Sequence, residues 1–61
     1  MYCALIVDDE SIIRRGLRCM IPWTSLGFSE VLEAASAEIA LRITEETRVD
    51  LIITDICMPG M

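Results

Sequence analysis

The sequence predicts an α/β domain in which three strands alternate with two helices and form a parallel sheet. Two short segments, residues 4–7 and 51–54, are continuously apolar or β-branched, as is typical of strands that are covered on both faces. Between them, apolar residues recur at helical spacing over two longer segments. Strands that alternate with helices of this length pack as a parallel sheet with right-handed crossovers, so we expect the order β-α-β-α-β.

The bulk composition limits the class of protein. The 61 residues correspond to at most one small domain, and a hydrophobic content of 54% is too high for a disordered chain. No apolar run approaches the roughly 20 residues that a membrane-spanning helix needs. The N-terminus has neither the basic region nor the cleavage site of a signal peptide, so we expect a cytoplasmic protein without a membrane partner.

The charge balance is acidic, with ten aspartates and glutamates against five arginines and a formal net charge of −5. This balance argues against a nucleic-acid surface within these residues. It suggests a cation site, although a solvated acidic surface would have the same composition. The sequence contains no histidine, which excludes histidine-based catalysis and most zinc sites.

The three cysteines, Cys3, Cys19 and Cys57, are an odd number and have no C-x-x-C spacing. They therefore cannot all pair with one another in a single chain. We interpret them as free thiols in a reducing compartment, with a metal-binding or redox role as the alternative.

The first strand, residues 4–7, leads into a helix predicted over about residues 10–20. The helix carries an apolar stripe made of Ile12, Ile13, Gly16, Leu17, Met20 and Ile21. Three arginines fall mostly on the opposite side, where we expect solvent: Arg14, Arg15 and Arg18. Glycine in a helix interior costs about 1 kcal/mol relative to alanine, which suggests that Gly16 allows a close approach of the helix to the sheet.

A connection over residues 22–27 joins this helix to the second strand and is punctuated by proline and glycine. We expect its apolar anchors to close the end of the sheet opposite Asp55: Trp23, Leu26 and Phe28. The second strand is predicted over residues 30–35. Its two glutamates, Glu30 and Glu33, interrupt the apolar run and favour a position at the sheet edge.

The second helix is predicted over about residues 37–47, with Ser36 as its N-cap. We expect four of its residues to face the sheet: Ala40, Leu41, Ile43 and Thr44. The third strand, residues 51–54, then delivers Asp55 onto a loop. A following Met-Pro-Gly segment ends this strand, because proline cannot donate to the ladder and glycine permits a sharp turn.

Acidic residues follow two of the predicted strands: Asp8 and Asp9 come after the first, and Asp55 after the third. If these strands are parallel neighbours, the three carboxylates meet at the carboxyl edge of the sheet, where open α/β sheets bind their ligands. Clustered carboxylates repel one another unless a cation intervenes, and Mg²⁺ prefers such oxygen ligands. An aspartate beside Mg²⁺ can attack phosphorus and form an acyl phosphate. The alternatives are helix capping by Asp8 and Asp9 and a turn role for Asp55.

Two motifs resemble those of the receiver domain of two-component response regulators: Ile6-Val7-Asp8-Asp9-Glu10, and Ile53-Thr54-Asp55-Ile56-Cys57-Met58-Pro59-Gly60-Met61. Two further segments, residues 13–17 and 21–28, resemble receivers that are fused to a C-terminal AraC-type helix-turn-helix domain. The resemblance covers residues 1–61, which would be a truncated receiver domain containing only the first half. It implies a flavodoxin-like, doubly wound sheet of strand order 2-1-3-4-5, of which this chain supplies 2-1-3.

The resemblance implies a role for each acid. Asp55 is the phospho-acceptor, which takes a phosphoryl group from the phosphohistidine of a sensor histidine kinase. The implied Mg²⁺ site comprises Asp8, Asp9, Asp55 and the backbone carbonyl of Cys57; Asp9 is a direct ligand and Asp8 orients a metal-bound water. The exposed face of the first helix, including Arg15, is implied to dock the kinase, with a simple solvated face as the alternative.

The resemblance also implies a regulatory domain rather than an enzyme. In the full-length protein, phosphorylation is implied to control a transcriptional output domain that binds DNA, whereas residues 1–61 alone are not expected to switch. The third strand becomes an exposed apolar edge, so we expect self-association as a homodimer or larger oligomer. A receiver-like interaction module that is never phosphorylated is the alternative. A haloacid-dehalogenase-like phosphatase is set aside, because it needs an acid where Cys57 stands.

Overall fold

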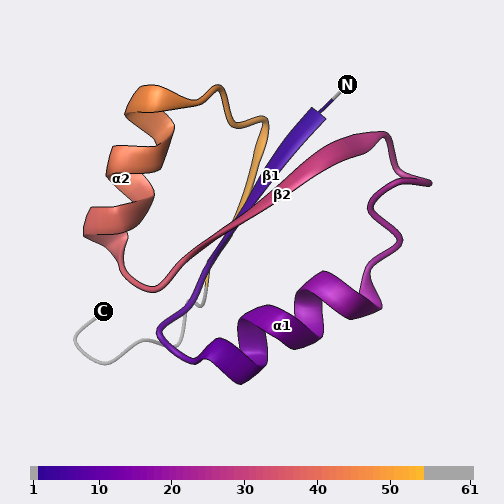
Figure 1. The fold of residues 1–61 in the computed structure, drawn as a ribbon, viewed down its shortest axis with the longest axis horizontal. Helices are drawn as coiled ribbons and strands as arrows, with labels where there is room; N and C mark the ends of the chain where they lie inside the picture. Colours follow the sequence, from indigo (N-terminus) through magenta and orange to yellow (C-terminus); the bar gives the residue numbers. More distant parts are fainter. Residues whose placement is uncertain (1, 55–61) are drawn as a thin grey trace.

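The computed structural model describes residues 2–54, which form a three-stranded sheet with two helices (Figure 1). The elements follow one another in the order β1 (Tyr2–Val7), α1 (Ser11–Met20), β2 (Phe28–Ala34), α2 (Ala37–Glu46) and β3 (Leu51–Thr54). The predicted α/β class is confirmed. Neither of the helices within the described residues is long and apolar enough to cross a membrane.

The sheet has the strand order β2-β1-β3, and both neighbouring pairs are parallel. This is the predicted order 2-1-3, with β1 in the centre. Val7 pairs with Ala34 of β2 on one side and with Thr54 of β3 on the other. The strands therefore end level with one another, and the residues that follow Val7 lie at the carboxyl edge of the sheet.

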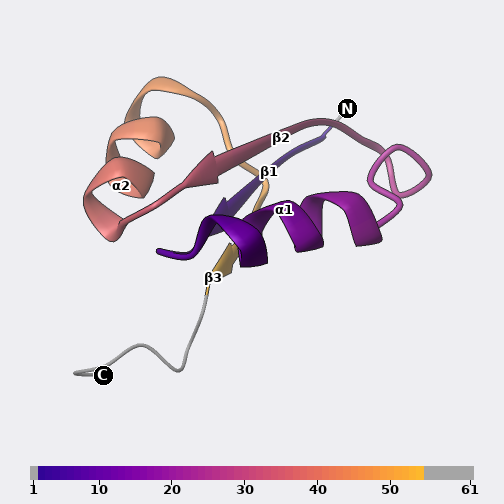
Figure 2. The ribbon, with the colours of Figure 1, turned by 60° about the horizontal axis from the view of Figure 1, so that its bottom comes forward.

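The helices α1 and α2 lie on opposite faces of the sheet, which makes the fold doubly wound (Figures 1 and 2). Successive side chains of a strand point to opposite faces, so the apolar run of β1 supplies both halves of the core. On the α1 face, the core consists of Ala4, Ile6 and Trp23, against which Leu17 and Ile21 pack. On the α2 face, it consists of Leu5, Val7 and Ala34, against which Leu32, Ala40, Ile43 and Val49 pack.

The strand β2 begins at Phe28, earlier than predicted, because Phe28 pairs with Tyr2. Its ring also packs edge-on against Trp23, with 5.5 Å between the ring centroids. Trp23 is buried, so both aromatic residues are anchors as predicted, whereas Leu26 is exposed and is not. The connection lies at the amino end of β1, since the N–H of Tyr2 donates to the carbonyl of Gly27 at 3.0 Å.

Several predicted core residues of the helices are exposed. Ile12 and Met20 of α1 are each 81% exposed, and Leu41 of α2 is also exposed. Thr44 does not face the sheet either, because it is exposed and its hydroxyl donates to the carbonyl of Leu41 at 2.8 Å. A three-stranded sheet offers each helix only a narrow surface, so the buried stripe is narrower than the helical pattern indicates.

Two further predictions about α1 are wrong. A Cβ atom at Gly16 would meet nothing within 4 Å, so this glycine does not serve a close approach to the sheet. Arg14 does not extend into solvent: its side chain is 16% exposed and reaches Glu33 of β2. This flank of α1 therefore faces the edge strand β2 rather than solvent.

The apolar sequence of β3 predicts a strand that is covered on both faces, and this prediction is wrong for the described residues. Leu51 is 41% and Ile52 is 50% exposed, whereas Ile53 packs against the core on the α1 face. Within residues 2–54, the only strand beside β3 is β1, so the other side of β3 is open. An apolar strand with an open edge can pair with another chain.

Candidate functional site

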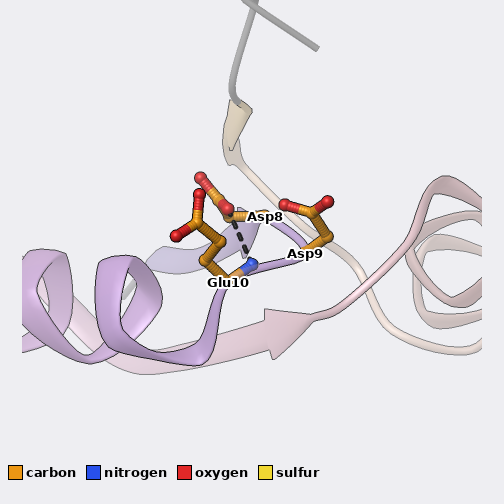
Figure 3. A group of neighbouring side chains, drawn as sticks. All are labelled: Asp8, Asp9 and Glu10. Carbon is orange, nitrogen blue, oxygen red and sulfur yellow. Dashed lines mark hydrogen bonds between the residues drawn. The ribbon is translucent and has the colours of Figure 1, made fainter. Parts of the chain in front are cut away.

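Three acidic residues follow β1 directly, and their carboxylates lie on the same side of the chain (Figure 3). We call residues 8–10 the acidic loop. One carboxylate oxygen from each of Asp8, Asp9 and Glu10 lies within 4.8 Å of the others. Asp8 is buried, with 5% of its surface exposed, whereas Asp9 and Glu10 are exposed. The cluster therefore runs from the sheet edge out to solvent.

Hydrogen bonds of the backbone and the side chain of Asp8 hold the acidic loop against the sheet. The N–H of Asp8 donates to the carbonyl of Ala34 at 3.1 Å, which continues the β1–β2 ladder by one residue. The side chain of Asp8 accepts the N–H of Glu10 through Oδ1 at 2.9 Å (Figure 3). This is the turn that an aspartate forms with the backbone two residues ahead.

Helix capping does not account for these acids. Glu10 is the N-cap residue of α1, has an extended backbone, and makes no side-chain cap. The bond from Glu10 N–H to Asp8 shapes the turn before the helix and leaves the helical N–H groups untouched. By contrast, Ser36 caps α2 as predicted, because its Oγ accepts the N–H of Ile39 at 3.2 Å.

The donor set fits a hard divalent cation. Direct Mg²⁺ ligands lie at about 2.1 Å, so two of them are at most about 4.2 Å apart. The carboxylate oxygens of the acidic loop, all within 4.8 Å, are close to that spacing. Mg²⁺ keeps several waters, so a carboxylate slightly too distant for direct contact can bind through one of them.

Glu10 is a member of the cluster that the sequence pattern did not single out. Its carboxylate lies beside that of Asp8, although the helical pattern assigns Glu10 only to the start of the helix. The signal was present, since Glu10 directly follows the two aspartates. When three consecutive acids follow a strand in a tight turn, all three carboxylates can lie at the same edge of the sheet.

Two of the predicted site residues, Asp55 and Cys57, lie outside the described residues. What the structure describes is the strand that leads to them. Thr54, the last residue of β3, pairs with Val7, which directly precedes Asp8. The neighbouring, parallel and level arrangement of β1 and β3 is the arrangement on which the three-acid prediction depends.

A hollow of about 340 Å³ opens beside the acidic loop, between α1 and the end of β3. Its polar lining comes from the acidic loop and Thr54, and its apolar lining comes from β1, α1 and β3: Val7, Asp8, Glu10, Ile13, Leu17, Ile53 and Thr54. The acids therefore border a concave surface, which is where binding sites usually lie.

Two arginines of α1 bind Glu33 of β2, and one of them also reaches the acidic loop. Arg14 Nε donates to Glu33 Oε1 at 3.1 Å, and Arg18 Nη1 donates to Glu33 Oε2 at 3.0 Å. The hydrogen bond from Arg18 and then that from Arg14 hold the pKa of Glu33 below its usual value, although burial opposes this shift. Arg14 Nη1 also donates to the backbone carbonyl of Asp8 at 2.6 Å, so the network reaches the acidic loop.

Comparisons with known proteins give one consistent result. Residues 4–61 match the family model described as "Response regulator receiver domain". An "Uncharacterized response regulatory protein" of Staphylococcus epidermidis is 42% identical over 59 residues, which cover 97% of this chain and 24% of that protein. The "Transcriptional regulatory protein HptR" of Staphylococcus aureus is 41% identical over 59 residues, which cover 97% of this chain and 23% of that protein. The chain thus spans about a quarter of the length of these relatives, and no solved structure gives a significant match.

Proposed function

Because this chain belongs to the response regulator receiver family of two-component signalling, we propose that it accepts a phosphoryl group on Asp55 with the help of Mg²⁺. The observation that carries the proposal is the acidic loop. Three carboxylates gather at the end of the central strand, level with the end of the strand that leads to Asp55. Receivers commonly bind Mg²⁺ at an acidic cluster of this kind.

The proposed metal site consists of Asp9 as a direct ligand, Asp8 acting through a bound water, Asp55, and the backbone carbonyl of Cys57. When bound, Mg²⁺ would neutralise the charge on the phosphoryl oxygens. The buried position of Asp8 and the exposure of Asp9 support this division of roles, since the outer carboxylate is the one that reaches into solvent. Glu10 adds a third negative charge beside the site.

In the proposed reaction, a carboxylate oxygen of Asp55 attacks the phosphorus of a phosphohistidine on a sensor histidine kinase. The new O–P bond forms as the P–N bond breaks, and the electron pair stays on the imidazole nitrogen, which then takes up a proton. The product is an acyl phosphate on Asp55. It adds a charge of about −1.5 to −2 at the carboxyl edge of the sheet, which is enough to bias a two-state surface.

We further propose that the kinase docks on the exposed face of α1. This face combines a cation with large apolar side chains, since Arg15, Ile12 and Met20 are all exposed. Apolar side chains of this size on a helix surface are typical of a protein-binding face. We also propose that the full-length protein acts in the cytoplasm.

The proposed output is transcriptional control by a DNA-binding domain of the AraC type. The likeness of residues 13–17 and 21–28 to such receivers supports the AraC type, and the name of the Staphylococcus aureus relative supports transcriptional control only. The acidic charge of residues 1–61 supports DNA contact by the output domain and not by these residues.

The 61-residue chain is also proposed to self-associate through β3. Leu51 and Ile52 are half exposed on a strand whose outer side is open within the described residues. Light scattering at high micromolar concentration would then give a mass above that of a monomer. A compact, stable monomer at that concentration would contradict self-association.

The proposed phospho-acceptor role is tested with a small-molecule acyl phosphate as donor. We expect a phosphorylated species by intact-mass measurement that requires Mg²⁺, disappears with EDTA and is absent in Asp55→Asn. Mg²⁺-independent labelling, or labelling that persists in Asp55→Asn, would contradict the proposal. An unlabelled protein that nevertheless binds a kinase would instead favour the interaction module.

A further inference from the structure

We propose that Arg14 is a positioning residue that joins the acidic loop to Glu33 of β2 and so holds the loop in the shape that binds the cation. The helical pattern alone does not indicate this role, because it places Arg14 on the side of α1 that faces solvent. The inference rests on the proposed function, in which the acidic loop is part of the Mg²⁺ site. It assigns to Arg14 a contact with the loop but none with the cation.

The guanidinium of Arg14 bridges two elements that are far apart in the sequence. Nη1 donates to the backbone carbonyl of Asp8 at 2.6 Å, and Nε donates to Glu33 Oε1 at 3.1 Å. The side chain is 16% exposed, so both bonds are partly shielded from water. Arginine suits this position because its planar fork of donors can serve two acceptors in a fixed geometry, which a lysine ammonium cannot.

The bond to the carbonyl completes a set of restraints on Asp8. Its N–H is bound by Ala34 of β2, and its Oδ1 is bound by the N–H of Glu10. The bond from Arg14 fixes the remaining backbone group, the carbonyl that leads into Asp9. The direction of the chain at Asp9, the proposed direct ligand, therefore depends on the guanidinium.

The charge of Arg14 does not compete with a cation at the loop. Its guanidinium bonds to the carbonyl of Asp8 and leaves the carboxylates to other partners. Its positive charge is partly offset by Glu33, which lies within 3.1 Å and is shared with Arg18. Arg14 can thus order an anionic loop without neutralising it, as expected for groups that orient metal ligands from outside the coordination shell.

A purely structural ion pair between α1 and β2 is the competing interpretation, and Arg18 provides the matched control. Arg18 binds the other oxygen of Glu33 at 3.0 Å, comes from the same helix, and is 54% exposed. It makes no contact with the acidic loop among the hydrogen bonds of the described residues. Substituting Arg18 therefore removes an arginine–Glu33 pair and spares the loop.

The experiment compares the whole 61-residue chain with Arg14→Gln, Arg18→Gln and Arg14→Lys in two measurements. The first is amide hydrogen exchange at Asp8 and Glu10, whose N–H groups are hydrogen-bonded, without metal, and the second is Mg²⁺ affinity from amide-shift titration. We expect Arg14→Gln to accelerate exchange at both amides and to weaken Mg²⁺ binding about tenfold. Arg18→Gln should leave both quantities within about twofold of the wild type. Arg14→Lys keeps the charge but loses the two-point bridge. Its exchange rates and its Mg²⁺ affinity should therefore lie between those of the wild type and Arg14→Gln.

Each outcome supports or contradicts the positioning role of Arg14 or the proposed metal site. Equal effects of Arg14→Gln and Arg18→Gln on exchange and affinity would overturn the positioning role. A wild-type chain that does not bind Mg²⁺ would overturn the proposed metal site, and exchange in the metal-free protein would still test whether Arg14 orders the loop. If Arg14→Gln fails to fold by circular dichroism, Arg14→Lys provides the comparison with Arg18→Gln.

Discussion

Cys3 and Asp50 exchange two hydrogen bonds where β1 and β3 begin. The N–H of Cys3 donates to Asp50 Oδ2 at 2.9 Å, and the N–H of Asp50 donates to the carbonyl of Cys3 at 2.8 Å. These bonds set the register in which Thr54 pairs with Val7 at the other end of the strands. Asp50 lies just before β3 and thus helps to align the other end of this strand, Thr54, with Val7. The proposed site requires this alignment.

Asp50→Ala should destabilise the domain, because it leaves the N–H of buried Cys3 without its partner. A buried donor that loses its acceptor costs about 1–3 kcal/mol. Urea unfolding measures the difference, and Arg48→Ala is the matched control. Arg48 is 3.9 Å from Asp50 but almost fully exposed, so its removal should change the free energy of unfolding by less than about 0.5 kcal/mol. Equal losses in both variants would contradict the role given to Asp50.

Glu33 should make the domain less stable in acid. Its pKa is lowered by hydrogen bonds from Arg18 and Arg14, so the folded state favours the ionised carboxylate. That contribution is fully present above the unfolded pKa of about 4.3 and is lost as the pH falls through the lower folded pKa. Glu33→Gln should cost about 1 kcal/mol at neutral pH, and the loss should fade as the pH falls. A deficit that is independent of pH would contradict a stabilising ion pair at Glu33.

Cys3 should affect stability at the opposite end of the pH range. Burial, followed by the charges of Glu30 and Asp50, raises the pKa of its thiol. The folded state therefore favours the protonated thiol, whose contribution is present below the unfolded pKa of about 8.5 and is lost as the pH rises through the folded pKa. Cys3→Ala should remove that alkaline decline in the free energy of unfolding. An unchanged alkaline decline would contradict the prediction.

The same environment predicts selective modification of the thiols. Cys3 is buried, whereas Cys19 is exposed on α1. Only the thiolate reacts readily, so iodoacetamide near pH 8 should modify Cys19 well before Cys3. Peptide mapping by mass spectrometry follows each site, with Cys19→Ser as the control. Faster modification of Cys3 than of Cys19 would show that β1 is accessible.

Two glycines should respond to alanine with opposite signs. Gly16 lies inside α1, where an added Cβ atom would meet nothing within 4 Å, so Gly16→Ala should stabilise the domain by about 0.5–1 kcal/mol. Gly27 has a φ of 94°, and a Cβ there would lie 3.4 Å from the ring of Tyr2. Gly27→Ala should therefore destabilise the domain by more than about 1 kcal/mol. Thermal unfolding compares the two variants, and a loss of stability in Gly16→Ala would contradict the geometry of α1.

The nature of each element was predictable because the signals are local and strong, whereas the strand order 2-1-3 was predicted from the resemblance to receiver domains. Residues 4–7 and 51–54 are apolar or β-branched throughout, and two helical patterns lie between the strands. The start of β2 was missed because Phe28 follows a glycine turn, and only its pairing with Tyr2 shows that it extends the strand. Pairing of distant residues is not visible in a sequence window.

The acids at the end of β1 were also predictable, whereas the residues that hold them were not. Asp8 and Asp9 follow an apolar strand, which is a sequence signal in its own right. The role of Arg14 depends on where α1 lies relative to β2, because Glu33 of β2 faces a flank of α1 that a helical wheel assigns to solvent. Asp55 and Cys57 lie outside the described residues, so their roles stay predictions.

The proposed Mg²⁺ site can be tested by a Mg²⁺ titration of the 61-residue chain, followed by amide chemical shifts in the wild type and in Asp9→Asn. We expect saturable shifts that cluster at the acidic loop and at Asp55 and Cys57, and that are lost in Asp9→Asn. Shifts that do not saturate, or that persist unchanged in Asp9→Asn, would contradict a Mg²⁺ site at the carboxyl edge of this sheet.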